Sequence, residues 1–477
     1  MATTELTSAQ LDRAAGVMLA TACGDALGAP YEFNSAASVA RMLEGLDAIP
    51  MKGGGGFGWA PGEWTDDTSM AIPLLQAVAD AKDLRDESVQ DEVVAAWIDW
   101  ARTAPDVGSQ TRAVLSGLEP SAAAARVAAK RVHDATGRSA GNGSLMRTAP
   151  VVLAYLDDPA ALADAARAIS DLTHFETDAG DACVLWTLAI RHAILAGELN
   201  VRAGLDALPA GRRGRWATLL AEAEQKVPAD FQRNPWVVEA LQGAWSAIAT
   251  TTQDGTATHL RRGLEAAVRG GKDTDTVAAI AGGLIGARYG ASAVPSAWKR
   301  IVHGWPGLRA RDLMRLSLQA VGGAATERID YAGYGDIATL VRHPHDEGVW
   351  LGAVGSLDAL PDEVDAVVSL CRVGTAQVSS RIEHHVEVWL IDKAEPHHNP
   401  NLDFVLTDAA DAIAALRTEG RTVLLHCVQA QSRTPTVAAL YAARHKGVPA
   451  GQALAEVSAA LPAAWPNPAF REFLREL

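Results

Sequence analysis

The sequence predicts a chain of two domains, an all-α domain at residues 1–325 followed by an α/β domain at residues 326–477. Its 477 residues exceed the roughly 100–200 of a usual single domain. Alanine-rich stretches with helical periodicity, such as 86–129 and 158–196, continue until about residue 325. Beyond that point, short and nearly continuous apolar runs alternate with helical stretches. This alternation is typical of an α/β fold with a mostly parallel sheet.

Composition and charge exclude several classes of function. The hydrophobic content of 48% is sufficient for large cores, and the net charge of −15 argues against general nucleic-acid binding and against anionic membranes, because their phosphates require a positive face. Four cysteines give no disulfide framework, which favours a reducing cytoplasm. The apolar stretch 14–23 resembles a signal-peptide core, but Glu5 and Asp12 stand where basic residues are expected. No run reaches the ~18 apolar residues that a membrane helix needs.

The chain begins with a predicted helix. Thr7 and Gln10 have the spacing of a capping box, and the apolar residues that follow at helical spacing predict one buried face. Gly24 and Gly28 mark the end of this helix and permit close approach of another backbone. Asp25, between them, is interpreted as a turn or helix-end residue. The glycine-rich stretch 53–58 is interpreted as a mobile loop bordering a site, since no Gly-Lys-Ser/Thr follows it to indicate a phosphate loop.

The next motif is Thr65-Asp66-Asp67-Thr68, which leads into an apolar helical run. Adjacent carboxylates repel each other and raise each other's pKa unless a cation neutralises them. Carboxylate and hydroxyl oxygens are hard ligands, which suit Mg²⁺ or Mn²⁺ better than zinc. The alternative is structural, because Asp or Thr at this position is also a common helix N-cap.

A second motif of the same chemistry lies far downstream. Asp273-Thr274-Asp275-Thr276 again supplies acids and hydroxyls, and it leads into the apolar helical run 277–287. Asp273 and Asp275 are two residues apart and would face the same side of an extended or turn backbone. Two facing helix starts of this kind indicate a binuclear site for hard metal ions.

Between these motifs lies a turn that offers free backbone N–H groups. Gly141-Asn142-Gly143-Ser144 belongs to the stretch 139–150, and a loop of this composition can hold a diphosphate or be a plain turn. His174, further on, is a lone histidine of the kind that is usually structural.

Four blocks together resemble the ADP-ribosylglycohydrolase family, in that family's order and over roughly residues 10–325: Gly24 to Gly28 with Glu32, Trp64 to Thr68, Gly141 to Arg147, and Asp273 to Thr276. The resemblance implies cleavage of the glycosidic bond between ADP-ribose and a protein side chain or small acceptor. It implies two Mg²⁺ ions, with Mn²⁺ as the alternative, held by Thr65, Asp66, Asp67, Asp273, Asp275 and Thr276. It also implies catalytic roles for Glu32, Asp66, Asp67 and Asp275, and substrate contacts from Gly141, Asn142, Gly143, Ser144, Arg147 and His174, with Arg147 holding either the loop or its ligand.

The second domain is predicted from four short apolar strands. They lie at residues 348–354, 366–371, 386–391 and 422–426, and helical stretches separate some of them. The last strand leads directly into His426-Cys427, and Arg433 follows Cys427 after five intervening residues. In a strand–loop–helix context, loop N–H groups can hold a tetrahedral oxyanion and favour the thiolate form of Cys427. Arg433 can bind phosphate oxygens in a bidentate manner.

This motif resembles the dual-specificity subgroup of the cysteine-based protein phosphatases, over about residues 330–477. The resemblance implies Cys427 as nucleophile, Arg433 and Thr434 around the phosphate, and Asp392, on the loop after the preceding strand, as general acid, with Glu395 as the second candidate for that role. One residue departs from the pattern, since Ala430 stands where the family usually has glycine. If this position needs a positive φ, alanine costs about 1 kcal/mol or more.

These features predict a bifunctional cytoplasmic hydrolase. Its substrates would be an ADP-ribosylated protein or small molecule and a phosphorylated compound, with no membrane partner. Two alternatives come from a different class: the second domain is a phosphate-binding module without catalysis, or the protein is a reader of ADP-ribosylated partners.

Overall fold

The computed structural model describes residues 5–251, 255–323 and 326–477. Two compact units emerge: Met1–Val294 with Ile301–Gly323, and Pro295–Arg300 with Ala324–Leu477. The predicted boundary at residue 325 falls on positions outside the described residues. The second unit also includes the short segment 295–300, which precedes that boundary in the sequence.

The first unit is helical apart from a two-stranded antiparallel ribbon, β1 (His303–Gly304) and β2 (Leu308–Arg309). Its 3₁₀ segments include η1 (Ala29–Tyr31) and η2 (Asn142–Ser144). Its helices are α1 (Ser8–Gly28), α2 (Ala36–Met42), α3 (Asp66–Ala79), α4 (Glu87–Ala101), α5 (Ser109–Leu115), α6 (Ala122–Thr136), α7 (Pro159–Asp171), α8 (Thr177–Ala196), α9 (Ala210–Ala223), α10 (Val237–Ala249), α11 (Thr258–Arg269), α12 (Thr274–Tyr289) and α14 (Ala310–Ala320).

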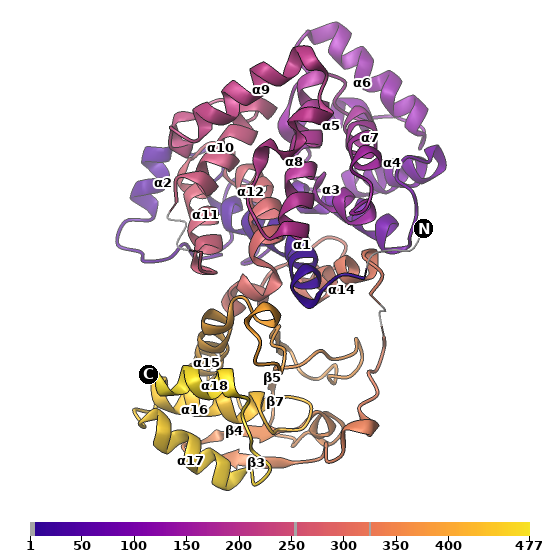
Figure 1. Ribbon diagram of the computed structural model, residues 1–477. Coiled ribbons are helices and arrows are strands. Elements are labelled where there is room, and N and C mark those ends of the chain that lie inside the picture. Colours follow the sequence, from indigo (N-terminus) through magenta and orange to yellow (C-terminus); the bar gives the residue numbers. More distant parts are fainter. Residues whose placement is uncertain (1–4, 252–254, 324–325) are drawn as a thin grey trace. The chain divides into compact units, whose positions relative to one another are not determined.

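Helix α1 packs along α12 at the centre of the first unit (Figure 1). The capping box at its start forms as predicted, because Gln10 N donates to Thr7 Oγ1 and Thr7 N donates to Gln10 Oε1. A Cβ added to Gly24 would lie 2.2 Å from Ala278 O, and one added to Gly286 would lie 2.3 Å from Gly16 O. Glycines on both helices therefore allow backbone-to-backbone packing. Residues 14–28 are consequently buried on all sides, and the prediction of a single buried face was too narrow.

One described helix is long and apolar enough to cross a membrane by length and composition alone. Helix α8 has a mean hydropathy of 1.3 over an 18-residue window, and 78% of that window is buried inside the structure. Burial of this extent is typical of a core helix.

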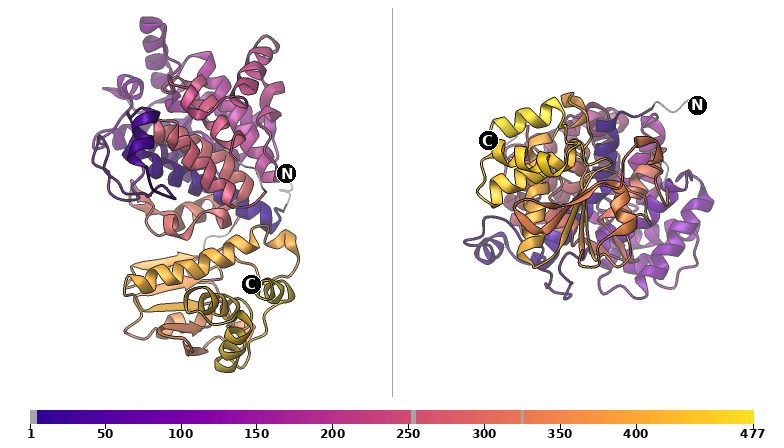
Figure 2. Two further views of the ribbon diagram at one scale, coloured as in Figure 1. Left: turned by 90° about the vertical axis from the view of Figure 1, so that its left-hand side faces the viewer. Right: turned by 90° about the horizontal axis from the view of Figure 1, so that it is seen from below.

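The second unit contains a five-stranded sheet in the order β3-β4-β7-β5-β6. Only the β3–β4 pair is antiparallel, so the predicted mostly parallel sheet is confirmed. Apolar residues of α15 to α18 cover one face of this sheet (Figures 1 and 2). Apolar residues of the 3₁₀ segment η8 (Val354–Ala359) and of the irregular stretch 371–382 cover the other. The elements are β3 (Leu340–His343), β4 (Asp346–Gly352), β5 (Ala366–Ser369), β6 (His384–Glu387), β7 (Val423–His426), α13 (Ser296–Lys299), α15 (Leu402–Thr418), α16 (Arg433–His445), α17 (Ala450–Ala460) and α18 (Pro468–Arg475).

Candidate active site

The acidic motif at residues 65–68 begins α3, and its cap comes from another helix. Asp25, near the end of α1, accepts hydrogen bonds from Thr65 N (2.9 Å), Thr68 N (3.0 Å) and Thr68 Oγ1 (2.6 Å). The side chain of Thr65 makes no cap and instead donates to Asp67 Oδ2 at 2.9 Å. Because Asp25 satisfies the helix N-terminus, the capping alternative for Asp66 and Asp67 is wrong, and both carboxylates are available for other roles.

The second acidic motif begins α12 and is fixed by two neighbouring segments. Asn142 Nδ2 donates to Asp273 Oδ2 at 2.7 Å, which joins the predicted phosphate loop to the acidic motif. Phe33 N donates to Lys272 O at 2.7 Å, and Lys272 N donates to Asn34 O at 2.6 Å. Both Phe33 and Lys272 have positive φ, near 65° and 68°. This strained pair of segments holds Glu32 beside Asp273.

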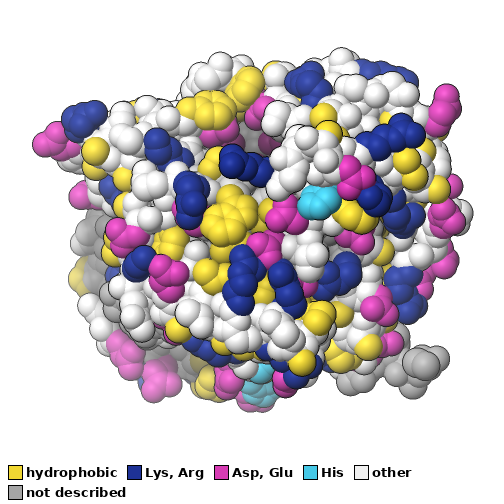
Figure 3. Space-filling model, turned by 90° about the horizontal axis from the view of Figure 1, so that it is seen from above, with side chains coloured by type: hydrophobic (Ala, Val, Ile, Leu, Met, Phe, Trp, Pro, Cys, Tyr) yellow, Lys and Arg dark blue, Asp and Glu magenta, His cyan; other side chains and the backbone are white. Residues whose placement is uncertain are grey.

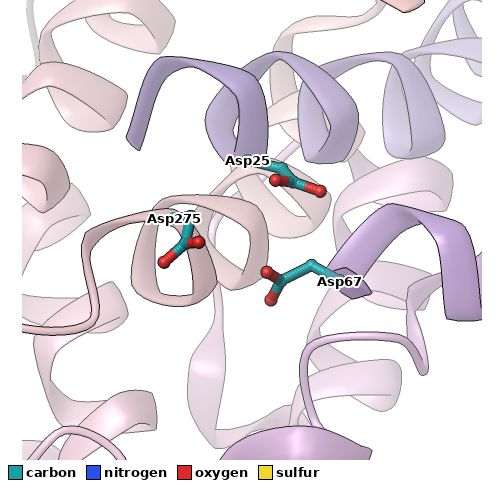
Figure 4. A group of neighbouring side chains, drawn as sticks. All are labelled: Asp25, Asp67 and Asp275. Atoms are coloured by element: carbon teal, nitrogen blue, oxygen red, sulfur yellow. The ribbon is translucent and has the colours of Figure 1, made fainter. Parts of the chain in front are cut away.

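The two motifs converge into two groups of carboxylates. Asp25, Asp67 and Asp275 form one group, and Glu32, Asp273 and Asp275 form the other, each with ligand atoms within 4.8 Å of one another. Figure 4 shows the first group, with one carboxylate from each of α1, α3 and α12 converging on a common space. Asp67 Oδ1 and Glu32 Oε2 are buried without a hydrogen-bond partner. Hard oxygen donors with unpartnered atoms fit a pair of Mg²⁺-like ions that share Asp275.

The electrostatics of these groups favour a bound cation. Burial is the largest cause that raises the pKa of Asp67 and Asp275 well above the usual carboxyl value, and neighbouring carboxylates raise both further. Burial and the nearby Asp273 raise the pKa of Glu32 to about 9. Without a cation, this many buried carboxyls retain protons or repel one another.

A cavity of about 550 Å³ opens beside the carboxylates. It is lined by Glu32, Asp66, Asp273, Asp275 and Thr276 on one side, and by Gly141, Asn142, Gly143 and His174 on another. A Cβ on Gly143 would lie 3.0 Å from His174 Cε1, so the loop needs glycine to pass this ring closely. Burial lowers the pKa of His174 to about 3, so the imidazole is neutral. The cavity is large enough for a small-molecule ligand.

Ser144 and Arg147 lie behind this loop and not in the cavity. Arg147 is fully buried, stacks 4.0 Å from the centroid of the Trp97 ring, and donates from Nη2 to Thr173 Oγ1 at 2.7 Å. Ser144 Oγ accepts from Ser170 Oγ at 2.9 Å. The prediction that Ser144 contacts a ligand is therefore corrected, because this residue supports the loop from inside. Of the two roles predicted for Arg147, holding the loop or holding its ligand, these contacts favour the first.

Two acidic residues of the site were missed from the sequence. Asp25 was interpreted as a turn or helix-end residue, although it contributes to a carboxylate group. Asp106 lines the cavity next to Asp66, and burial raises its pKa to about 6. The sequence did contain a signal for Asp25, because this residue lies in the block Gly24 to Gly28. Asp106 follows Pro105 outside every motif, so the sequence gave no signal for it.

In the second unit, the Cys427 loop connects β7 to α16 as the strand–loop–helix interpretation predicts. Arg433 is the first residue of α16, and its Nη1 donates to Leu370 O (2.9 Å) and Leu390 O (3.1 Å). Ala430 has φ of 55°. The loop therefore adopts the left-handed conformation that favours glycine, and alanine stores strain there.

Asp392 reaches the same loop from the far side. Its Oδ1 accepts from Ser432 Oγ at 2.6 Å and from Asn467 Nδ2 at 3.0 Å, and the residue is exposed. Thr434 is buried and donates to Gly352 O at 3.3 Å. These contacts place an exposed carboxylate beside the loop that carries Cys427 and Arg433.

Comparison with known proteins shows to which family the first unit belongs. The profile of the ADP-ribosylglycohydrolase family matches residues 6–328, and the chain belongs to this family. It is 32% identical over 301 residues to the ADP-ribosyl-(dinitrogen reductase) glycohydrolase of Rhodospirillum rubrum, which covers 60% of this chain and 89% of that protein. It is 30% identical over 293 residues to ADP-ribosylarginine hydrolase Tri1 of Pseudomonas putida, covering 60% and 73%. The protein is thus a hydrolase of the ADP-ribosylglycohydrolase type.

Similarity to phosphatases extends over a smaller part of the chain. Dual specificity protein phosphatase 1 of Arabidopsis thaliana is 27% identical over 133 residues, which cover 28% of this chain and 66% of that protein. Among solved structures, an ADP-ribosylglycohydrolase-related protein complex has a TM-score of 0.48 and 29% identity, covering 66% of this chain and 99% of that chain. Human DUSP28 has a TM-score of 0.26 and 24% identity, covering 29% and 90%.

Proposed function

We propose that the first unit hydrolyses the glycosidic bond between ADP-ribose and a protein side chain or small acceptor, with two Mg²⁺ ions, or Mn²⁺, in the carboxylate groups. One observation carries the proposal: two carboxylate groups that share Asp275 adjoin a cavity whose other wall is the Gly141–Gly143 loop. A diphosphate on that loop would direct a ribose toward the carboxylates.

The residues of the chain have distinct roles in this proposal. Asp67 and Asp275, with Asp25 supporting α3, and Glu32 with Asp273, would hold the two ions. Bound ions of this kind orient ribose hydroxyls and activate a water. Asn142 fixes the loop to Asp273, so a diphosphate on the loop and the two bound metal ions would stay at a constant distance from each other. Asp66 faces the cavity without belonging to either carboxylate group, so it can orient the water or the leaving group.

The test is ADP-ribose release from ADP-ribosylated arginine and serine peptides, with Mg²⁺ or with EDTA. Release should require Mg²⁺, and Asp275→Asn should lower the rate by at least about 100-fold. The matched control is Asp134→Asn, at an exposed position on α6 paired with Lys130, which should leave the rate unchanged. Full release by Asp275→Asn in EDTA would refute the metal-dependent mechanism, and binding without release would favour the alternative reader function.

A second candidate function belongs to the second unit, where we propose hydrolysis of a phosphate monoester through Cys427. The proximity of Asp392 to the Cys427 loop favours it, and the similarity to a dual-specificity phosphatase supports it. The Cys427 sulfur would bond to phosphorus as the ester P–O bond breaks, and Asp392 would protonate the leaving oxygen. Water would then displace the sulfur and release phosphate. Arg433 would bind the phosphate oxygens, since its Nε is buried without a partner.

Hydrolysis of p-nitrophenyl phosphate tests this second function. Cys427→Ser should abolish it and leave ADP-ribose release unchanged, whereas Cys371→Ser is the control at another buried cysteine. Asp392→Asn should slow alkyl phosphates more than nitrophenyl phosphate, because only the poor leaving group needs the proton. If the wild type and Ala430→Gly both bind phosphate without turnover, the unit is a phosphate-binding module.

A further inference from the structure

Asp392, in the second unit, has unusual partners for an exposed carboxylate. Acidic side chains at a protein surface commonly lie in water or opposite a lysine or arginine, as among the interspersed acidic and basic side chains of the face shown in Figure 3. Asp392 forms no ion pair with any residue that the structure describes. Its carboxylate instead accepts from the hydroxyl of Ser432 at 2.6 Å and from the amide of Asn467 at 3.0 Å. Both donors are neutral, so charge pairing does not explain the position of this carboxylate.

The two hydrogen bonds end on the same oxygen of Asp392. Ser432 Oγ and Asn467 Nδ2 both donate to Oδ1, whereas no described residue donates to Oδ2. A carboxyl group whose one oxygen accepts two hydrogen bonds carries its proton on the other oxygen. Oδ2 is therefore the atom that can hold a catalytic proton. When that proton leaves, the two donors on Oδ1 stabilise the negative charge that develops on the carboxylate.

The two donors also hold each other in place. Ser432 precedes the first residue of α16, but its side chain does not cap that helix. Its Oγ instead accepts from Asn467 N at 3.1 Å while it donates to Asp392. Asn467 caps α18, because its Oδ1 accepts from Phe470 N at 3.1 Å. The Asn467 amide is thereby oriented with its carbonyl toward the helix and its NH₂ group toward Asp392, and a flipped amide would lose both contacts.

Asn399 fixes the backbone on both sides of Asp392. Its Oδ1 accepts from Ile391 N and its Nδ2 donates to Ile391 O, both at 2.9 Å. The same Nδ2 donates to Lys393 O at 3.3 Å. The backbone and the carboxylate of Asp392 are thus held by separate sets of hydrogen bonds, and a carboxyl group held in this way needs little reorganisation before it transfers a proton.

We propose that Ser432 and Asn467 are positioning residues for the general acid, and that Asp392 transfers its proton from Oδ2. The proposal rests on the proposed phosphate-monoester hydrolysis and adds two residues to it. In the first step the Cys427 sulfur bonds to phosphorus as the ester P–O bond breaks, and the Oδ2 proton moves to the departing oxygen. In the second step water displaces the sulfur from phosphorus, and the Asp392 carboxylate takes the proton of that water.

The leaving group distinguishes the positioning of the acid from general damage to the site. Benzyl phosphate has a poor leaving group that needs the proton, whereas p-nitrophenyl phosphate has a good one. Asn467→Ser retains a residue type that caps α18 and removes the amide donor. It should lower kcat/KM at least about 10-fold for benzyl phosphate and less than about threefold for p-nitrophenyl phosphate. Ser432→Ala should act in the same direction. Asn200→Ser, the same substitution at an exposed N-cap of the first unit, is the matched control and should change neither value.

A double-mutant cycle tests whether Asn467 acts through Asp392. In the Asp392→Asn background, Asn467→Ser should change kcat/KM for benzyl phosphate less than about twofold, because the acid that it positions is gone. Equal slowing of both esters by Asn467→Ser, or its full effect in the Asp392→Asn background, overturns the positioning role while the hydrolysis itself stands. If the wild type hydrolyses neither ester, the proposed phosphatase function is refuted and this role with it.

Discussion

At the scale of single residues, replacing Asp67 should abolish Mg²⁺ binding but make the metal-free protein more stable. One of its oxygens accepts from Thr65, and the other is buried without a partner. We expect Asp67→Asn to stabilise the metal-free protein by about 1 kcal/mol, because asparagine avoids the free-energy cost of either protonating or burying a charged carboxyl near Asp25 and Asp66. The same change should abolish the stabilisation by Mg²⁺. Thermal unfolding in EDTA and in Mg²⁺ measures both effects. A variant that is less stable in EDTA and keeps the Mg²⁺ response would contradict the metal site.

Because of His174, the free energy of unfolding of the first unit should depend on pH in the acidic range. Burial, and then the charge of Arg147, lower its pKa from 6.5 to about 3. The unfolded chain binds a proton at this residue below pH 6.5, and the folded chain does not until about pH 3. Its contribution is therefore complete above pH 6.5 and is lost as the pH falls. Between pH 7.5 and pH 5 the loss should be about 2 kcal/mol in urea unfolding.

The variant His174→Asn isolates the contribution of this imidazole to the pH dependence. The difference in unfolding free energy between wild type and variant should shrink by that amount from pH 7.5 to pH 5, because asparagine does not titrate. A difference that stays constant over this range would show that the imidazole is protonated in the folded state.

At the scale of elements, the approach of α1 to α12 determines the geometry of the carboxylates. A Cβ on Gly28 would lie 2.4 Å from both Cα and N of Asp275, and backbone atoms cannot move aside as a flexible side chain can. Gly28→Ala should therefore separate the two helices, cost about 2 kcal/mol or more, and weaken the Mg²⁺ response. Gly214→Ala in α9, where an added Cβ meets nothing within 4 Å, should be neutral or stabilising by up to about 1 kcal/mol. Calorimetry of both variants makes the comparison.

Local sequence patterns predicted where helices and strands lie better than they predicted which residues contact one another across the fold. The capping box at Thr7, the helices after both acidic motifs, and the strand–loop–helix at Cys427 follow from residues adjacent in the sequence. The role of Asp25 as a cap for α3 depends on a contact across 40 residues, which periodicity does not encode. For the same reason the burial of Arg147 against Trp97 was not foreseen. The edge strand β3 was missed because it is short and only partly apolar.

At the scale of the whole molecule, the two units are not consecutive in the sequence. Pro295–Arg300 belongs to the second unit although it precedes the last helix of the first. Ser296 donates from N at 3.0 Å and from Oγ at 2.5 Å to Asp408, and Arg300 pairs with Glu419 at 2.6 Å. Such long-range contacts leave no trace in composition, so the change in pattern near residue 325 could not reveal them.

The segment Pro295–Arg300 should contribute to the stability of the second unit, so a fragment without it should be less stable. The fragment 326–477 retains its sheet and its helices α15 to α18, so we expect it to fold. It should nevertheless be less stable than the same unit in the full chain by about 1–3 kcal/mol, since Asp408 loses the N–H and hydroxyl donors of Ser296. Denaturant unfolding followed by a probe in the second unit measures the difference.

Asp408→Asn distinguishes this cause from a general effect of truncation. In the full chain the substitution weakens two charge-assisted hydrogen bonds and should destabilise the second unit. In the fragment 326–477 the partner is gone, so removal of the partly buried charge should be neutral or stabilising. The sign of the effect should therefore reverse between the two contexts. Equal destabilisation in both would mean that Ser296 contributes nothing to the unit, and the fragment would then owe any loss of stability to another contact.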